Sequence, residues 1–477
     1  MAEVVIVGGG IAGLATALLL GRQGSDVVVC ERDAGAVPAG ADEMWDRWDR
    51  PGIPQARLGH TFLPGFRVLL AERAPDVLER LYAAGAPLVD FAADVPGGAA
   101  RPGDGELAGI MCRRPVLEGI LRQAVEAEPT VDVRAGCDVT GLVGERPAAK
   151  GDAPRVVGVR TRGRGSIAAR TVVVAGGRLV PVRRWLAAID ALPVGEVSAG
   201  CGLVCFTRFF RIRPRASEDH RVSTELTVER DLGYMRYEIY GADSSKFCVE
   251  LIPAASDHEL RALRNEATHM AVARALPESH DWLDPERAMP IGPVAAMGQE
   301  RDVLRAFVHD GRPVALGLHV IGDARCQTHS LYAWGSHLAL AGAAAVADVV
   351  TEHRRDPEAQ ALALDARIGD EIAGRHALAC ARDRALQRVI RNEPEWDEGD
   401  AEHRFIHDVV VPASAEDPEI FRAVRRWELQ LDPAAALASN TAVRERARNL
   451  WVGRSTATRT TAPTREAVLA LIARSPA

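Results

Sequence analysis

The chain has 477 residues, of which 47% are hydrophobic, so it can bury more than one hydrophobic core. This length predicts two interwoven or sequential domains, and the composition excludes disorder over most of the chain. The formal net charge of -7 gives no basic surface of the kind that binds nucleic acid or an anionic membrane. A small molecule is therefore the expected partner.

Eight cysteines are scattered along the chain, with no CxxC pair and no histidine cluster at zinc-ligand spacing. The closest pair, Cys201 and Cys205, lies in "CGLVC", which is typical of a strand. We therefore expect buried, reduced thiols in a cytoplasmic protein, and no metal site. A signal peptide is not expected because "GGG" interrupts the first apolar run, and no uncharged stretch reaches the length of a membrane span.

The first thirty residues predict a strand, a helix and a second strand. "VVIV" and "DVVVCE" are β-branched runs typical of strands buried on both faces, and "IAGLATALLLGRQG" between them favours a helix. The turn before the helix reads "GGGIAG". We expect Gly8 to permit the tight turn, Gly10 to let the backbone approach a pyrophosphate, and Gly13 to let the helix pack closely. The turn's amides, that of Ala12 included, would receive the phosphates at the helix N-terminus.

An acidic residue stands at the end of the second predicted strand. Glu31 lies 18 residues after Gly13 and is followed by Arg32. A carboxylate at this place can accept hydrogen bonds from both ribose hydroxyls and would repel a 2'-phosphate. The pattern therefore favours FAD or NAD over NADP.

A second pattern, in residues 314–350, favours FAD. "VALGLHVIGD" predicts a strand that ends at Gly322 and Asp323, and a helix rich in small residues begins near Gly335. A carboxylate at a strand end can hold a polyol, and the N-terminus of the helix would direct its dipole at an electron-rich ring. FAD, with its ribityl chain and isoalloxazine, needs such a second site, whereas NAD does not.

At these motifs the sequence resembles the FAD-dependent monooxygenases of the para-hydroxybenzoate hydroxylase type. The resemblance is closer to the actinobacterial branch that includes squalene-epoxidase-like polyether epoxidases, and it covers roughly residues 4–350. It rests on "GGGIAG", "IGDA", "RPGIPQARLGH" (50–60), "RRPVLEGILRQAV" (113–125), "VDVRAGCDVTGLV" (131–143) and "VVVAGGRLVPVRRWL" (172–186).

The resemblance implies further roles at the cofactor. Arg114 would reach the flavin or its phosphates, the backbone at Val139 would meet the adenine, and Asp323 would hold the ribityl chain. The loop with Arg57 and His60 would pass near the flavin ring. A relative of this family would bind FAD and take electrons from NADH or NADPH, directly or through a partner flavin reductase.

Three departures from the family pattern affect the flavin surroundings. Gly176 and Gly177, followed by Arg178, stand where relatives have Asp-Gly or Thr-Gly; Ser330 replaces a proline; and "AWG", ending at Gly335, replaces a "GQG"-like turn. These changes leave open how NAD(P)H is received and how the substrate meets the flavin. Trp334 in "AWG" either narrows the pocket or packs in the core.

The predicted fold is α/β, with a Rossmann-type FAD-binding domain formed by residues 1–190 and 285–355. Alternating apolar and polar residues in "GLVCFTRFFRI", "RVSTELTV", "GYMRYEIYG" and "SKFCVELIP" predict an antiparallel substrate-binding sheet within residues 191–284. Residues 356–477 are rich in Ala, Arg, Glu and Leu with helical periodicity, and they predict a helical C-terminal region.

The expected function is the insertion of one oxygen atom, by hydroxylation or epoxidation, into a small organic molecule of specialised metabolism. Reduced flavin itself activates oxygen as a C4a-(hydro)peroxide, so no acid or base is required, and spacing identifies no catalytic residue. Alternatives are a flavin dehydrogenase or oxidase that desaturates its substrate, and a flavin-binding partner protein without turnover. A halogenase is disfavoured, because it needs a lysine beside the flavin and a "WxWxIP" segment. The chain lacks that segment and has only Lys150 and Lys246.

Overall fold

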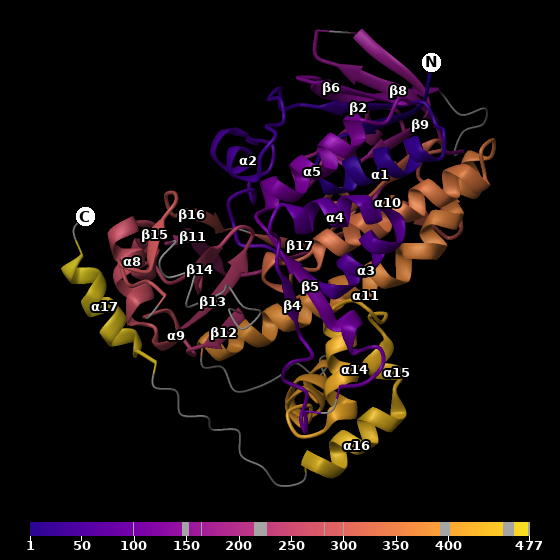
Figure 1. Cartoon of the computed structure of the whole chain (residues 1–477). Coiled ribbons are helices and arrows are strands. Elements are labelled where there is room, and N and C mark those ends of the chain that lie inside the picture. Colours follow the sequence, from indigo (N-terminus) through magenta and orange to yellow (C-terminus); the bar gives the residue numbers. More distant parts are fainter. Residues whose placement is uncertain are drawn as a thin grey trace.

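The computed structural model describes residues 1–98, 100–145, 152–163, 165–213, 227–280, 282–298, 300–391, 401–451 and 462–475. Lys150, residues 221–226 of the predicted strand "RVSTELTV" and part of the helical C-terminal region lie outside these ranges. Figure 1 shows a sheet with covering helices at the N-terminal end, a second sheet beside it, and a group of helices from the C-terminal part of the chain.

A seven-stranded sheet is the centre of the N-terminal part. Its strands are β1 (Ala2–Val7), β2 (Val27–Glu31), β6 (Val131–Ala135), β7 (Val139–Glu145), β8 (Arg155–Thr161), β9 (Gly165–Val174) and β20 (Leu318–Val320). The order is β6-β2-β1-β9-β8-β7, with β20 paired to β9. The pairs β1–β2, β1–β9, β2–β6 and β9–β20 are parallel, whereas β7–β8 and β8–β9 are antiparallel. This topology confirms the predicted Rossmann-type architecture.

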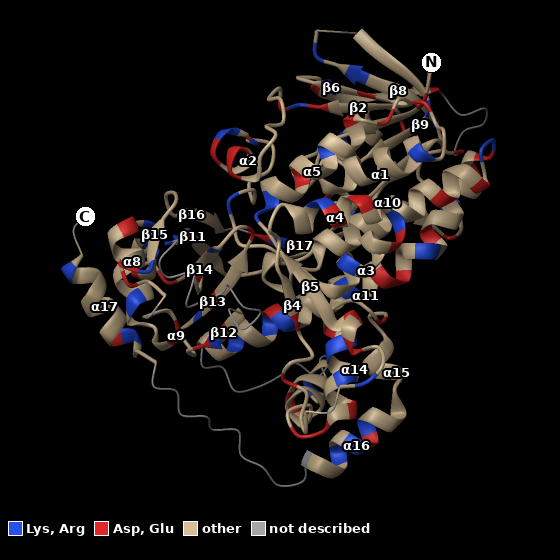
Figure 2. Cartoon of the chain, viewed as in Figure 1, with Lys and Arg blue, Asp and Glu red and all other residues tan. Residues whose placement is uncertain are grey.

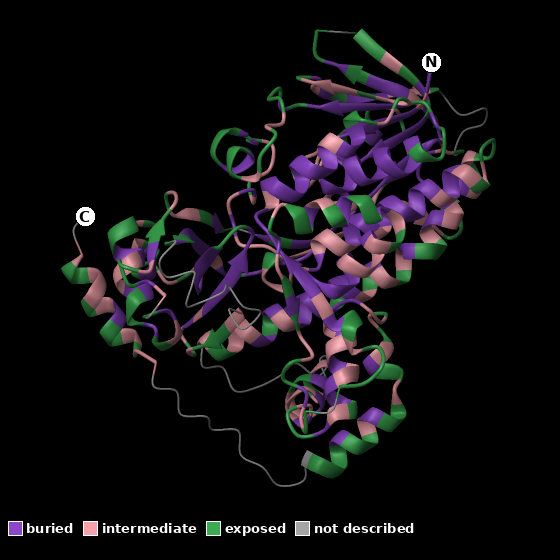
Figure 3. Ribbon diagram, in the orientation of Figure 1, coloured by how far each residue is buried: buried purple, intermediate pink, exposed green. Residues whose placement is uncertain are grey.

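Helices rich in small and apolar residues cover one face of this sheet. They are α1 (Ile11–Arg22), α5 (Arg114–Glu126) and α10 (Gly335–Glu352). Eleven of the twelve residues of α1 are buried, and α1 packs against both α5 and α10. Figure 3 shows α1 and α10 as largely buried helices. Helix α10 lies some three hundred residues after α1 in the sequence, yet both helices belong to one hydrophobic core. This core brings together the two sequence patterns that were predicted to hold one cofactor.

A six-stranded antiparallel sheet lies beside this domain. Its strands are β11 (Val204–Ile212), β12 (Thr227–Asp231), β13 (Met235–Ala242), β14 (Lys246–Pro253), β15 (Ala288–Pro290) and β16 (Ala295–Gly298). Phe206, Ile239 and Leu251 point from one face toward α8 (Glu266–Ala275). The alternate residues of the same strands form the opposite face. β15 and β16 belong to this sheet although they follow residue 284, where the sequence predicts the return to the FAD-binding domain.

Two small sheets, a two-stranded ribbon and further helices make up the rest of the described residues. One sheet joins β10 (Gly195–Gly200), β17 (Arg301–Ala306) and β21 (Cys326–Gln327); the other joins β3 (Thr61–Phe62), β4 (Leu88–Asp90) and β5 (Ala108–Met111). A two-stranded ribbon pairs β18 (Val308–His309) with β19 (Arg312–Pro313). The helices are α2 (Ala41–Arg47), α3 (Pro64–Arg73), α4 (Pro75–Ala83), α6 (Val182–Ala187), α9 (Pro277–His280), α11 (Pro357–Arg391), α12 (Ala401–Phe405), α13 (Val411–Ala413), α14 (Pro418–Glu428), α15 (Ala436–Ser439), α16 (Thr441–Trp451) and α17 (Arg465–Arg474).

The C-terminal helices divide between two places. Helices α14, α15 and α16 form one group below α11, with a core around Trp427, whereas α17 packs through Val468 against α8 of the six-stranded sheet (Figure 1). Charged residues of both signs are interspersed on the outer helices, while α1 is almost free of them (Figure 2). All eight cysteines are buried and free, as predicted. Within the described ranges, no helix combines the length and the apolar character needed to cross a lipid bilayer.

Candidate active site

One cavity of about 510 Å³ lies where the strand ends of the seven-stranded sheet meet the six-stranded sheet. It gathers eleven of the residues that the sequence predicts at the cofactor: Gly8, Gly10, Ala12, Glu31, Arg32, His60, Arg114, Val139, Gly322, Asp323 and Gly335. Gly13 and Arg57 are not among the lining residues. The residues come from segments more than three hundred positions apart, which only the tertiary fold brings together.

The glycines of the turn differ in the space that surrounds them. Gly8 has a φ of 106°, and a Cβ there would lie 2.7 Å from the carbonyl oxygen of Ala175. A Cβ on Gly13 would lie 1.9 Å from the carbonyl oxygen of Gly8, which is the close packing that the sequence predicts. A Cβ on Gly10, in contrast, would meet nothing closer than 3.9 Å. The chain itself thus requires the first and the last glycine, and the space beside Gly10 is open to a ligand.

Glu31 is held at the end of β2 by a buried network. Its Oε2 accepts hydrogen bonds from the backbone N–H of Gly9 at 2.7 Å and from Arg50 at 3.2 Å, and its Oε1 accepts one from the N–H of Asp33 at 2.7 Å. The side chain of Arg50 is only 2% exposed and also pairs with Asp33 and Glu118. Sequence reasoning did not select Arg50, although the motif "RPGIPQARLGH" begins with it.

His60 and Arg114 approach each other at the wall of the cavity. His60 donates from Nδ1 to the carbonyl oxygen of Leu58 at 3.0 Å and accepts at Nε2 from Arg114 at 3.3 Å. Burial and the neighbouring guanidinium of Arg114 lower the pKa of His60 to about 3, so the imidazole is neutral. Arg114 also pairs with Glu118, one helical turn further along α5, at 2.8 Å.

Asp323 lies at the other end of the cofactor region. It follows β20 and lines the cavity near Gly335, the first residue of α10. Arg178, which follows the glycine pair after β9, reaches toward it. The Arg178 Nε lies 3.7 Å from Asp323 Oδ2 and has no hydrogen-bond partner among the described residues, while Nη1 donates to Glu300 at 3.2 Å. The residue at the first departure from the family pattern therefore lies beside the carboxylate predicted to hold the ribityl chain.

Two aromatic contacts bear on the place of Trp334, which the sequence left open, and on Arg57, which the sequence predicted at the cofactor. Trp334 is 1% exposed and does not line the cavity; its indole N–H donates to the carbonyl oxygen of Glu428 at 3.0 Å. It therefore packs in the core with α14 instead of narrowing the pocket. Arg57 stacks over the ring of Trp45 at 4.4 Å, so it is His60, and not Arg57, that this loop directs to the cavity.

The cavity continues onto the face of the six-stranded sheet opposite α8. Cys205, Glu238, Tyr240 and Glu250 line it there. Glu250 Oε1 accepts hydrogen bonds from Thr207 at 2.5 Å and from the N–H of Gly59 at 2.9 Å. Burial raises the pKa of Glu250, and it raises that of Glu238 to about 8 against the opposing charge of Arg236. Sequence reasoning missed both carboxylates because a strand pattern alone does not show which face is inside.

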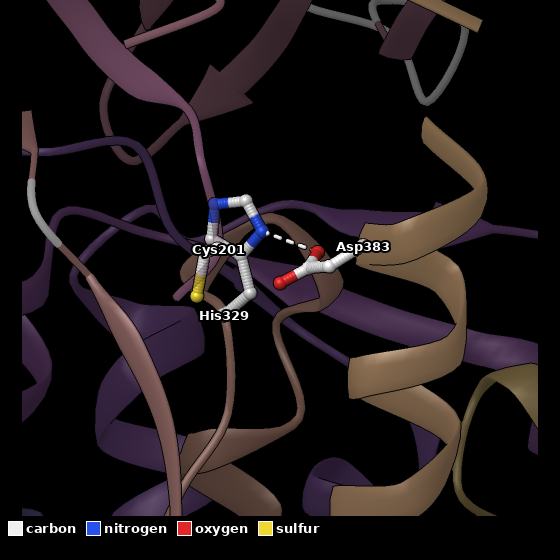
Figure 4. A group of neighbouring side chains, drawn as sticks. All are labelled: Cys201, His329 and Asp383. Atoms are coloured by element: carbon white, nitrogen blue, oxygen red, sulfur yellow. Dashed lines mark hydrogen bonds and ion pairs between the residues drawn. The ribbon is translucent and has the colours of Figure 1, made fainter. Parts of the chain in front are cut away.

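A second polar cluster adjoins the cavity through His329. Cys201, His329 and Asp383 bring side-chain atoms of metal-ligand type within 4.8 Å of one another. Figure 4 shows the His329 ring between the thiol and the carboxylate, with Nδ1 bonded to Asp383 at 2.8 Å. Although burial opposes it, Asp383 raises the pKa of His329, and Tyr332 also donates to Asp383, at 2.6 Å. Because Cys201, His329 and Asp383 lie far apart in the sequence, no short motif could have predicted this cluster.

The cofactor end of the cavity fits a dinucleotide with phosphate groups. No side chain caps the N-terminus of α1, so the first amides of the helix are free to receive an anion at Gly10. Five arginines line this part of the cavity, and three of them, Arg50, Arg114 and Arg162, are paired with carboxylates; the other two are Arg32 and Arg184. Asp323 lies beyond them as an acceptor for hydroxyl groups.

These features define a dinucleotide-binding domain of the Rossmann type. Comparison with known proteins specifies the dinucleotide, because residues 3–93 match the family model described as FAD dependent oxidoreductase. Residues 3–93 are therefore similar to this family, and FAD is the cofactor that the sequence predicted.

Over 145 residues the chain is 33% identical to the "Probable NADH-specific resorcinol 4-hydroxylase" of Rhodococcus jostii (strain RHA1). The match covers 29% of this chain and 24% of the hydroxylase, so the chain spans about a quarter of that relative.

Two solved structures show how widely the fold is shared. The p-nitrophenol 4-monooxygenase PnpA from Pseudomonas putida DLL-E4 superposes with a TM-score of 0.60 at 15% identity, covering 90% of this chain and 98% of that one. The myxobacterial chondrochloren halogenase CndH has a TM-score of 0.56 at 16% identity, covering 98% and 99%. At these identities the likeness establishes the fold. A monooxygenase and a halogenase share it, so the fold alone does not choose between these reactions.

Proposed function

We propose that the protein is an FAD-dependent monooxygenase that adds one oxygen atom to a small organic molecule, by hydroxylation or, as in the epoxidases that the sequence resembles, by epoxidation. NADH or NADPH supplies the electrons, directly or through a flavin reductase. One observation carries this proposal: the cavity that begins at the glycine turn and Glu31 passes Asp323 and continues without a break to the enclosed face of the six-stranded sheet. Cofactor and substrate thus have adjoining places in one space.

In this proposal, three groups of residues hold FAD. The α1 amides near Gly10 receive the pyrophosphate, Glu31 accepts from the ribose of the adenosine with Val139 near the adenine, and Asp323 accepts from the ribityl chain. Arg50 supports this arrangement by holding the Glu31 carboxylate in place. Bound FAD supplies the redox chemistry and the activation of oxygen, and the protein supplies binding, orientation and exclusion of water.

Two further features of the cavity wall, the N-terminus of α10 and His60, support this proposal. The N-terminus of α10 at Gly335 carries a partial positive charge, which would stabilise negative charge on a bound flavin. His60, neutral and fixed by Leu58 and Arg114, offers a hydrogen-bonding edge without adding a charge.

The test begins with the purified protein and its visible flavin spectrum after incubation with FAD. Bleaching of the flavin band by NADH, by NADPH or by an added flavin reductase identifies the electron donor. Product mass then identifies the reaction: a gain of one oxygen atom supports the proposal, and a loss of two hydrogen atoms indicates the dehydrogenase alternative. A protein that takes up no FAD would overturn the proposal.

The structure adds an argument against halogenation. Lys246 is buried on β14, its Nζ lies 2.7 Å from Asp42, and it is not among the residues that line the cavity. It is therefore not placed to carry an activated halogen from the flavin to a substrate. Incubation with chloride or bromide is expected to give no halogenated product.

A further inference from the structure

The sheet end of the cavity carries two carboxylates in one row. Glu238 on β13 and Glu250 on β14 are directly opposite each other in the antiparallel ladder, and Thr207 on β11 is opposite Glu250. Residues in this relation have side chains on the same face of a sheet, about 5 Å apart at Cβ. Like charges in such a pair repel each other, so one carboxyl keeps its proton, in line with the raised pKa of Glu238, unless a cation lies between or beside the two groups.

The hydrogen bonds of the two carboxylates are incomplete on the described part of the chain. Glu238 Oε1 accepts from Arg236 Nε at 2.5 Å, but Glu238 Oε2 is buried without a partner, in a side chain that is 1% exposed. Both hydrogen bonds of Glu250 described above fall on Oε1. A buried carboxylate oxygen without a donor is costly, and such groups are normally completed by a ligand or a counter-charge.

On the described part of the chain, no arginine that lines the cavity forms an ion pair with Glu238 or Glu250. The lining arginines belong to the cofactor side, and Arg178 among them is paired with Glu300. Arg236 contacts Glu238 but is shared with Glu229 and does not line the cavity. The cavity is therefore basic where it meets the cofactor and acidic where it meets the sheet.

We propose that the sheet end binds a substrate that carries an amine, whose ammonium group donates hydrogen bonds to Glu238 Oε2 and to Glu250. This inference rests on the proposed function, since it places the substrate of the monooxygenase on this sheet. The ammonium group completes the unpartnered oxygen of Glu238 and takes the place of the proton that burial otherwise holds on this side chain, and that proton passes to solvent. A molecule with a carboxylate at the same place adds a negative charge beside Glu250 with no arginine of the sheet end to balance it, and it is bound less tightly.

The experiment compares matched pairs of probes on the FAD-loaded protein: benzylamine with benzoate, and hexylamine with hexanoate. Binding is measured from the shift in thermal unfolding and from the perturbation of the visible flavin spectrum. We expect each amine to bind at least about tenfold more tightly than its carboxylate partner, as one charge-assisted contact provides. Equal binding, tighter binding of the carboxylates, or no binding of either amine would overturn the inference.

Three variants test whether Glu238 and Glu250 produce the preference for amines. Glu238→Gln and Glu250→Gln keep the size of the side chain and remove the charge, so each is expected to reduce the preference for amines by about tenfold. The control is Glu229→Gln, which removes a carboxylate that contacts the same Arg236 but is 53% exposed and outside the cavity. It is expected to keep the preference. A loss of preference in the control, or its persistence in both cavity variants, would contradict the assignment.

The outcome separates the two proposals. If the protein takes up FAD but shows no preference for amines, the substrate class is wrong and the monooxygenase proposal stands. If it takes up no FAD, the monooxygenase proposal fails, and the same probes on the cofactor-free protein still decide whether the two carboxylates bind an amine.

Discussion

The cofactor end of the cavity is lined by glycines, backbone amides and arginines, whereas the sheet end is lined by buried carboxylates. The first end is built from loops at strand ends, where amides and guanidinium groups can turn toward an anion. The second is built from side chains in the middle of strands, where alternate residues must face the cavity. The two ends of the cavity are therefore expected to respond differently to substitution.

Replacing Gly13 should disturb the cofactor end most. A Cβ in Gly13→Ala would lie 1.9 Å from the Gly8 carbonyl oxygen, so α1 must move away from the strand. We expect the free energy of unfolding to fall by about 3 kcal/mol or more, measured by urea denaturation. The matched control is Gly10→Ala, whose Cβ meets nothing within 3.9 Å. It should unfold within about 1 kcal/mol of the native chain and bind FAD more weakly. Equal stability of both variants would contradict this distinction.

At the sheet end, pH should act through Glu238. Because burial raises its pKa to about 8, the folded protein holds a proton that the unfolded chain, with an ordinary value near 4.5, has lost. Stability therefore falls as the pH rises between these two values and is constant above them. Arg236, Glu229 and Glu250 are the charged neighbours that set the size of this effect.

Glu238→Gln removes this titration. Relative to the native chain it should gain a few kcal/mol between pH 5 and pH 8, as urea denaturation across that range would measure. Glu229→Gln, which changes an exposed carboxylate, should follow the native curve closely. Parallel curves for Glu238→Gln and the native chain would show that this carboxylate is ionised in the folded protein throughout.

The carboxylate of the cofactor end should matter for affinity more than for stability. Glu31→Gln places an amide where Oε1 and Oε2 accept from two backbone N–H groups and Arg50, and it weakens the proposed contact to the ribose. We expect FAD to bind about tenfold more weakly, measured by titration of the cofactor-free protein. Glu128→Gln, which alters a surface pair with Arg22 in the same domain, should leave FAD affinity unchanged. Unchanged affinity in Glu31→Gln would remove the ribose role.

The smallest effect is expected at Trp334. Trp334→Phe loses the hydrogen bond to the Glu428 carbonyl oxygen and should cost about 1 kcal/mol in the free energy of unfolding. Because this ring lies outside the cavity, the flavin spectrum and the preference for amines should not change. A shifted flavin spectrum would indicate that Trp334 contacts the cofactor after all.

The cofactor end of the cavity could be predicted from short sequence motifs. The turn at Gly8 and Gly13, the carboxylate at Glu31 and the strand end at Asp323 are local patterns, because a tight turn, a helix N-terminus and a strand end each depend on a few consecutive residues. The parallel sheet and FAD followed from them. Arg50 belongs to one of the quoted motifs, but its role could not be predicted from the motif. Only the structure shows that Arg50 forms buried ion pairs with Glu31 and Glu118.

The side chains that face the cavity at the sheet end could be identified only from the tertiary structure. Whether Glu238 and Glu250 face the cavity or the helices depends on strand register, and a shift of one residue reverses it. The same holds for His329, Asp383 and Cys201, which meet only because distant segments fold together. Contacts between residues far apart in sequence are set by packing of the whole chain, and so the charge of the sheet end of the cavity could be recognised only in the folded protein.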